Sequence, residues 1–217
     1  VYRDVRVRLS YPATGTATTV ACSTDNFAIR PDRFINVLAA DENWQTTGTT
    51  RTLANNAATD GNVHKAGRPF TLSVTAVNAG SVVTSNYTGN PTATIVCTLP
   101  SATCVNGTLA ATWDGSGTRI SEEATYSEVG SFDLTLVDST FANVDINDSS
   151  VAEYTISSVT PTVPPVVVGR FVPDHFRLTV STTPEFQTFN AACLAARSFT
   201  YICLLYTSDA ADEEDSV

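Results

Sequence analysis

The most constraining feature of this sequence is an alternation of apolar and polar residues with a period of two. It recurs along most of the 217 residues. In the segment VRVRLSY, residues 5–11, apolar side chains alternate with Arg6, Arg8 and Ser10. The same spacing appears in residues 70–76, 93–99, 131–138 and 176–180. Successive side chains of a strand point to opposite faces, so this pattern predicts strands with one buried face. Because no segment shows a convincing helical period, we expect an all-β protein.

Short segments rich in glycine, proline and asparagine separate the alternating runs, among them YPATG, YTGNP, WDGSG and SEVG. Strands punctuated in this way favour an antiparallel sandwich. The stretch ATYSEVGSFDLTLVD, residues 124–138, resembles the penultimate hairpin of bacterial immunoglobulin-like repeats. We therefore expect an immunoglobulin-like β-sandwich. The segment TPTVPPVVVGR, residues 160–170, contains three prolines, which predicts a semi-rigid linker or an edge segment between two domains.

Cys97 and Cys104 flank a Pro/Ser turn, TLPSAT, between two strand-like segments. A hairpin can bring two Cβ atoms at this spacing within bonding distance, so we expect a disulfide. The alternative is two unpaired, half-buried thiols. Cys22 and Cys193 could pair with each other or with other partners, and the sequence does not choose between these options. The absence of a CxxC motif and the presence of only two His argue against a zinc site.

The formal net charge is −10, with one Lys beside eleven Arg and no basic stripe. This composition argues against nucleic-acid binding. No run of eighteen apolar residues exists in the sequence, so no transmembrane helix is expected.

The sequence contains no nucleophile elbow, P-loop or G-x-G-x-x-G motif. His175 follows Asp174, but neighbouring residues of a strand point to opposite faces, so we do not expect them to form part of a catalytic triad. Glu122 and Glu123 are interpreted as solvated edge charges rather than the two acids of a glycosidase. We expect a protein that is not an enzyme and has no cofactor, with calcium as the one exception to consider.

A cluster of hard oxygen donors, suited to Ca²⁺, lies in DSTFANVDINDSS and comprises Asp138, Asp145, Asn147 and Asp148. Its VDIND stretch resembles the linker of calcium-bound cadherin repeats, although the spacing is not that of an EF-hand. The favoured alternative is a turn cluster, because Asn and Asp side chains cap their own backbone.

The last fifteen residues look unlike the rest of the chain and carry five of its acidic side chains. The stretch CLLYTSDAADE, from Cys203 to Glu213, resembles the conceptual translation of a transposase adapter used in short-read library preparation. We therefore expect residues 203–217 to be a non-native tail and Cys203 not to be a native cysteine. The alternative is a genuine acidic tail.

Two further stretches carry a family resemblance. One is CSTDNFAIRPDRF, residues 22–34, preceded by YRDVRVRLSYPATG, and the other is VGRFVPDHFRLTV, residues 168–180, followed by FTYI. Together with AGRPFTLSVTAVNAG and NYTGNPT, they resemble the C-terminal region of the MshQ-like proteins of mannose-sensitive haemagglutinin pilus biogenesis. The resemblance extends from about residue 2 to Ile202. In that family we expect Gly where this chain has Cys203.

The resemblance implies an exported protein of a type IV pilus system, at the cell surface or in the periplasm, built from β-sandwich modules. Residues 1–30 would end an upstream module, 31–165 would form a complete immunoglobulin-like domain, and 166–202 would begin a downstream domain. We expect core positions for Phe27, Ile29, Phe34, Trp113 and Phe132, with Phe171 and Phe176 packing in the downstream domain and Arg170, Asp174 and His175 at the junction.

The function implied is that of a non-catalytic structural or adhesive module, whose partners are pilus or other cell-surface proteins. Its exposed sheet edges could add a strand from a partner. The alternative is a carbohydrate-binding domain for surface glycans, with Trp44 or Trp113 as the stacking platform, and Trp44 is favoured because it lies in the polar DENWQ loop. The competing interpretation of Trp44 is a loop side chain folded back onto the sandwich.

Overall fold

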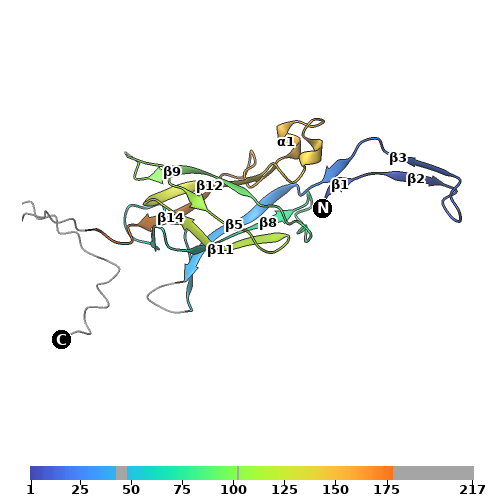
Figure 1. Ribbon diagram of the computed structural model, residues 1–217. Coiled ribbons are helices and arrows are strands. Elements are labelled where there is room, and N and C mark those ends of the chain that lie inside the picture. Colours follow the sequence, from blue (N-terminus) through green and yellow to red (C-terminus); the bar gives the residue numbers. More distant parts are fainter. Residues whose placement is uncertain (43–47, 102, 178–217) are drawn as a thin grey trace, which may run out of the picture. The chain divides into compact units, whose positions relative to one another are not determined.

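The fold consists of two β-sheets that share one hydrophobic core, together with two short β-ribbons near the N-terminus (Figure 1). The computed structural model describes residues 1–42, 48–101 and 103–177. The chain divides into two compact units, Val1–Val172 and Pro173–Val217. All the named strands lie in the first unit, so the predicted all-β class is confirmed.

The first sheet has five strands in the order β10-β11-β8-β5-β6. Their bounds are Leu109–Ala110 for β10, Thr118–Tyr126 for β11, Phe70–Val77 for β8, Arg33–Glu42 for β5 and Thr50–Thr52 for β6. All of its ladders are antiparallel.

The second sheet has the order β13-β12-β14-β7, and β9 also pairs with β12. The bounds are Ile156–Ser157 for β13, Gly130–Asp138 for β12, Val166–Val172 for β14, His64–Lys65 for β7 and Thr92–Leu99 for β9. The ladders of this sheet are antiparallel except the one between β14 and β7, which is parallel. The central strand of this sheet is therefore β12.

The two ribbons are β1 with β4 and β2 with β3, both antiparallel. The bounds are Tyr2–Val5 for β1, Arg8–Tyr11 for β2, Thr19–Cys22 for β3 and Phe27–Ile29 for β4. The only helical segments in the described residues are short: a 3-10 turn, η1, at Asn143–Asp145 and one α-helical turn, α1, at Val151–Tyr154. No helix in this part of the chain is long and apolar enough to cross a membrane.

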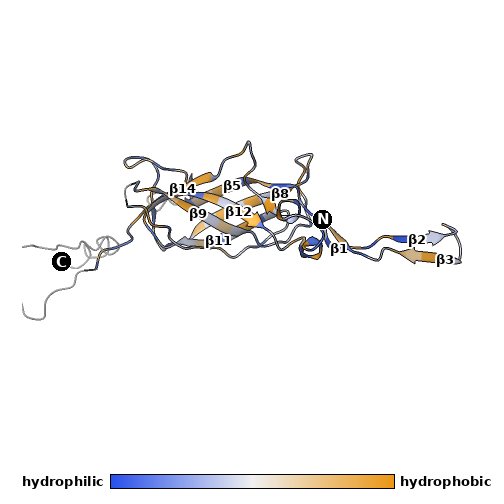
Figure 2. Ribbon diagram, turned by 90° about the horizontal axis from the view of Figure 1, so that it is seen from above, coloured by the Kyte–Doolittle hydropathy of each residue, from blue (hydrophilic) through white to orange (hydrophobic). Residues whose placement is uncertain are grey.

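The core is made of the inward-facing residues of both sheets, as the alternating pattern predicts. Strand β8 buries Phe70, Leu72 and Val74, and β12 buries Phe132, Leu134 and Leu136. In Figure 2 the hydrophobic residues, in orange, lie on strands of the two sheets, such as β5 and β14. The expected burial of Phe34, Trp113 and Phe132 is confirmed.

The SEVG turn joins β11 to β12 and requires glycine at its last position. Gly130 has φ of +104°, a conformation that L side chains rarely adopt. A Cβ atom at Gly130 would lie 1.8 Å from the carbonyl oxygen of Leu99. This turn therefore fixes where β12 begins beside β9.

The structure corrects two expectations. Val166–Val172 does not begin a separate downstream module, because it forms β14, pairs with β12 and buries Val168 and Phe171 in the shared core. The prolines before it precede a strand of the same body. Phe27 and Ile29 were expected in the core, but these residues are 41% and 48% exposed, because among the described residues β4 pairs with β1 alone and joins neither sheet.

Candidate functional site

A buried carboxylate at the end of β12 organises the loop that follows it. Asp138 Oδ2 accepts a hydrogen bond of 2.7 Å from the hydroxyl of Tyr87. Asp138 Oδ1 accepts three more: from the amide and the hydroxyl of Thr140, each at 2.8 Å, and from the amide of Phe141 at 3.0 Å. A buried charge costs free energy unless it is hydrogen-bonded, and here both oxygens are satisfied. The Asp138 carboxylate therefore fixes the conformation of residues 139–141.

Tyr87 is fully buried and packs against Phe34 and Phe141. Burial raises the pKa of the Tyr87 hydroxyl well above its usual value, and the hydrogen bond to the Asp138 carboxylate raises it further. The hydroxyl therefore stays protonated and remains a donor to Asp138.

The loop held by Asp138 contacts the first ribbon of the chain. The guanidinium carbon of Arg3, on β1, lies 4.4 Å from the ring centroid of Phe141. The Arg3 side chain also donates a hydrogen bond of 3.4 Å to the carbonyl of Thr140. A cation over an aromatic face is attracted by the ring quadrupole. The conformation set by Asp138 thus positions both groups that receive Arg3.

The second strand of the ribbon, β4, is held by η1 and α1. The carboxylate oxygens of Asp145 accept a hydrogen bond from the amide of Ala28, at 3.1 and 3.3 Å. The side chain of Arg30 donates to the carbonyl of Glu153 and, at 2.7 Å, to the carbonyl of Pro31. We call this set of contacts, from Arg3, Ala28 and Arg30 to residues 140–153, the ribbon joint.

The helical turn that receives Arg30 carries its own start signal. The carboxylate of Glu153 accepts hydrogen bonds of 2.7 Å from both the amide and the hydroxyl of Ser150. These bonds lower the pKa of the Glu153 carboxyl, with the backbone bond as the main cause. The Ser-x-x-Glu spacing is the capping box, a signal present in the sequence that the strand-based interpretation missed.

The four calcium candidates do not converge. Asp138 points into the core and Asp145 points to Ala28, while Asn147 and Asp148 are exposed. Within the described residues, no three His, Cys, Asp or Glu side chains gather where they could hold a metal ion. The carboxylates of Asp138 and Asp145 act instead as acceptors for hydroxyl and backbone groups.

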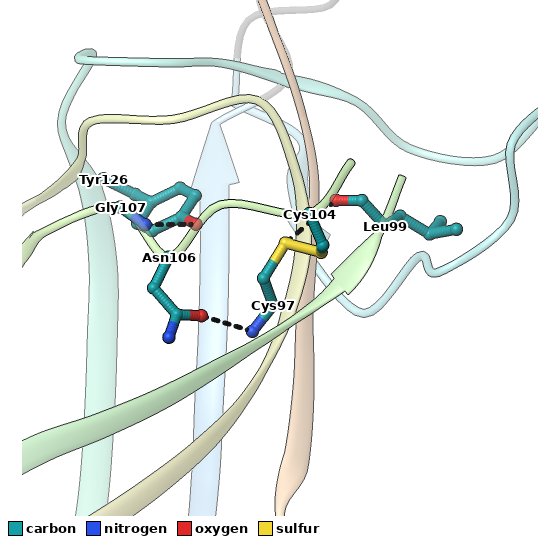
Figure 3. Close-up of a disulfide and its surroundings, with 6 residues drawn as sticks. All are labelled: Cys97, Leu99, Cys104, Asn106, Gly107 and Tyr126. Atoms are coloured by element: carbon teal, nitrogen blue, oxygen red, sulfur yellow. Dashed lines mark hydrogen bonds between the residues drawn. A yellow bond between two sulfur atoms is a disulfide. The ribbon is translucent and has the colours of Figure 1, made fainter. Parts of the chain in front are cut away.

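Cys97 and Cys104 form a disulfide, as expected from their spacing (Figure 3). The bond closes the turn that follows β9. Beside it, the amide of Cys97 donates a hydrogen bond of 2.7 Å to the side-chain oxygen of Asn106. The amide of Gly107 donates to the hydroxyl of Tyr126 at 3.2 Å. The disulfide and these two hydrogen bonds fix the loop after β9 against β9 and β11.

A buried ionic cluster joins the two sheets, and nothing in the sequence pattern identified it. Arg51 on β6 donates two hydrogen bonds to the carboxylate of Asp41 on β5, at 3.0 and 2.6 Å. Nδ1 of His64 on β7 lies 2.7 Å from the same carboxylate, and the His64 ring packs edge-on against Phe70 and Phe171. This carboxylate therefore links strands of the first sheet to a strand of the second.

Other candidates stand apart from these contacts. Trp44, the candidate glycan-stacking residue, lies outside the described residues, as do Cys193 and the tail 203–217. Cys22 is exposed and unpaired among the described residues. Nδ1 of His175 lies 3.1 Å from the Asp174 carboxylate, because these residues are not in a strand and their side chains are not on opposite faces. Phe176, expected to pack, is 43% exposed.

Comparisons with models of known protein families, with curated proteins and with solved structures find no match.

The disulfide is expected to stabilise the fold mainly by restricting the unfolded chain. Cys104→Ala should lower the free energy of unfolding by roughly 2–3 kcal/mol, because the bond closes a short loop. Cys22→Ala, which removes the exposed thiol, is the matched control and should leave stability unchanged. Denaturant unfolding measures both, and equal midpoints for the two variants would contradict the assignment.

Tyr87 predicts how stability depends on alkaline pH. Its pKa is raised in the folded state, so its contribution is fully present below the unfolded value of 10.0 and is lost as pH rises above that value. Each such proton contributes about 1.4 kcal/mol per pH unit to the slope. Tyr87→Phe should make the fall of stability with pH shallower, by an amount that approaches about 1.4 kcal/mol per pH unit only above pH 10, whereas Tyr11→Phe, at an exposed tyrosine, should not. Urea unfolding between pH 9 and pH 11 measures the slope, and an unchanged slope in Tyr87→Phe would refute the assignment.

The ribbon joint predicts a local effect of Asp145. Asp145→Ala should speed hydrogen exchange of the Ala28 amide by about tenfold or more, because a bond to a charged acceptor contributes about 1.5–3 kcal/mol. Exchange in β8 and β12 should stay unchanged. Asp148→Ala, an exposed carboxylate nearby, is the control. Unchanged exchange at Ala28 would show that Asp145 does not hold the ribbon.

Proposed function

We propose that this chain is a non-catalytic structural and adhesive module of an exported bacterial surface protein associated with a type IV pilus. The observation that carries the proposal is the ribbon joint. Three side chains, those of Arg3, Asp145 and Arg30, fasten the first ribbon to the segment 140–153 that follows β12. A protein that transmits force or displays a surface needs its consecutive β-elements to keep a fixed orientation relative to one another. The contacts of the ribbon joint hold the first ribbon in this way.

Two further observations support the proposal. The Cys97–Cys104 disulfide is compatible with an oxidising, extracytoplasmic compartment. The polar clusters of the first unit are used in holding the fold: Asp138 fixes a loop, and Asp41 fixes three strands. The resemblance to MshQ-like proteins adds the pilus association, the immunoglobulin-like character of the two-sheet body and the assignment of residues 1–30 to an upstream module.

Export is testable through Cys22, whose side chain is exposed. In a chain carrying Cys193→Ser and Cys203→Ser, expressed in a bacterium with type IV pili, a membrane-impermeant maleimide should label Cys22 in intact cells or after outer-membrane permeabilisation. The Cys97–Cys104 pair should resist alkylation without a reductant. Cys22→Ser is the matched control and should abolish labelling.

The outcomes separate the possibilities. Labelling in intact cells supports a surface position, and labelling only after outer-membrane permeabilisation supports a periplasmic one. Labelling only after lysis of the inner membrane would overturn export. Deletion of the gene should reduce pilus-dependent adhesion, and unaltered adhesion would remove the pilus association.

A further inference from the structure

Strand β9 lies at an edge of the second sheet and lacks the features that usually keep an edge strand from pairing with another chain. Within the described residues it pairs with β12 alone, in a register from Thr92 opposite Val137 to Leu99 opposite Ser131. Edge strands expose unpaired N–H and C=O groups, and proteins protect them with short length, charged side chains or proline. β9 has eight residues, TATIVCTL, with no charged residue and no proline.

The hydrogen bonds show which backbone groups of β9 face outward. The amide of Cys97 donates to Asn106 and therefore points away from β12. In an antiparallel ladder the direction alternates, so the amide and carbonyl of Ala93 and Ile95 also point outward. Leu136 lies opposite Ala93, and its amide and carbonyl form hydrogen bonds with Ser158, on the side of β12 away from β9. The backbone groups of Leu136 therefore do not pair with those of Ala93, as the alternation requires. Asn106 occupies one end, and residues 92–96 remain as the open edge of β9.

The β2–β3 hairpin has an exposed apolar face. β2 and β3 pair with each other and with no other strand in the described part of the chain. Val7, Leu9 and Tyr11 share one face of the hairpin, and Leu9 and Tyr11 are 67% and 74% exposed. A two-stranded hairpin alone is at best marginally stable in water, so this apolar hairpin face needs a cover.

The backbone of β2 is also free along one side. The carbonyls of Val7 and Tyr11 accept hydrogen bonds from the β3 side, from the amides of Ser23 and Thr18. By the same alternation, the backbone groups of Arg8 and Ser10 point outward. β2 can therefore pair with a further strand.

Charge favours contact between the hairpin region and the two-sheet body of another copy. In the hairpin segment, residues 6–22, the charged residues are Arg6 and Arg8, whereas residues 31–172 contain six Lys or Arg and thirteen Asp or Glu. On the body, Asp133 lies opposite Val96 and on the outer face of β12, because its neighbour Leu134 faces the core. On the hairpin, Arg6 and Arg8 occupy the face opposite the apolar one.

We propose that the β2–β3 hairpin of one copy of this chain adds to the open edge of β9 of a second copy. β2 would then extend the second sheet, with the apolar hairpin face beside Ile95 and with Arg8 on the face that carries Asp133. The two surfaces differ, so the contact is heterologous and builds a head-to-tail chain of copies. The inference rests on the proposed function, because it names a second copy as the partner of the structural module.

The test is self-association of the full chain with Cys22→Ser, Cys193→Ser and Cys203→Ser, which removes cross-linking through cysteines other than the Cys97–Cys104 pair. Sedimentation velocity over a concentration series should show oligomers that grow with concentration and shrink with added salt. Val96→Lys should block the edge, and Leu9→Lys with Tyr11→Lys should block the hairpin. Each should raise the dissociation constant by about tenfold or more. Val82→Lys, at an equally exposed valine, is the matched control and should assemble like the parent.

The decisive measurement is a mixture of the two blocked chains. The Val96→Lys chain retains its hairpin and the Leu9→Lys, Tyr11→Lys chain retains its edge, so an equimolar mixture should form a dimer that cannot grow. Ala93→Pro is a second edge variant. It removes an outward N–H and leaves the ladder with β12 intact, so it should behave like Val96→Lys.

Several outcomes would overturn the proposal. A parent chain that stays monomeric at all concentrations would do so, as would assembly that survives Val96→Lys and Ala93→Pro. Assembly that is lost in the edge variants but kept in the hairpin variant would indicate pairing between two β9 edges instead. None of these results bears on the labelling of Cys22 in cells, so failure of self-association and failure of export are distinguishable.

Discussion

The buried carboxylate of Asp138 is the interaction on which the functional geometry of this protein depends. It accepts four hydrogen bonds from three residues and leaves no oxygen unsatisfied. Removing such partners from a buried charge is costly, so the carboxylate admits one arrangement of the loop after β12. That loop presents Phe141 and the carbonyl of Thr140 to Arg3. The orientation of the first ribbon is thus determined by a group inside the body.

Apolar burial and polar contacts have different roles in the two-sheet body. Burial of side chains such as Leu134 and Phe132, each worth about 1.5–3 kcal/mol, drives the two sheets together. Hydrogen bonds and ion pairs add less net free energy, but they are directional. Asp41 with Arg51 and His64, and the Cys97–Cys104 disulfide, therefore determine which strands and loops meet rather than whether the chain collapses.

Two elements of the structure have a strand edge or an apolar face that is not paired or covered within the described residues. An alternating strand has one apolar face and two hydrogen-bonding edges, and each must be covered or paired. In the two sheets both requirements are met for β8 and β12. β9 lacks a partner on one edge among the described residues, and the β2–β3 hairpin lacks a cover for its apolar face. The incomplete elements are therefore the natural places for contacts with other chains.

The sequence by itself determined the features that depend on local spacing. Period-two alternation predicted the all-β class and the burial of Phe132, and a seven-residue separation across a turn predicted the Cys97–Cys104 disulfide. Only the tertiary structure decided which distant groups meet, such as Tyr87 with Asp138 and Ala28 with Asp145. It also placed β14 in the shared core and left Phe27 exposed. The local sequence does not distinguish one possible hydrogen-bond acceptor from another for a given donor. The register and packing of the assembled sheets determine which acceptor lies close enough to bond.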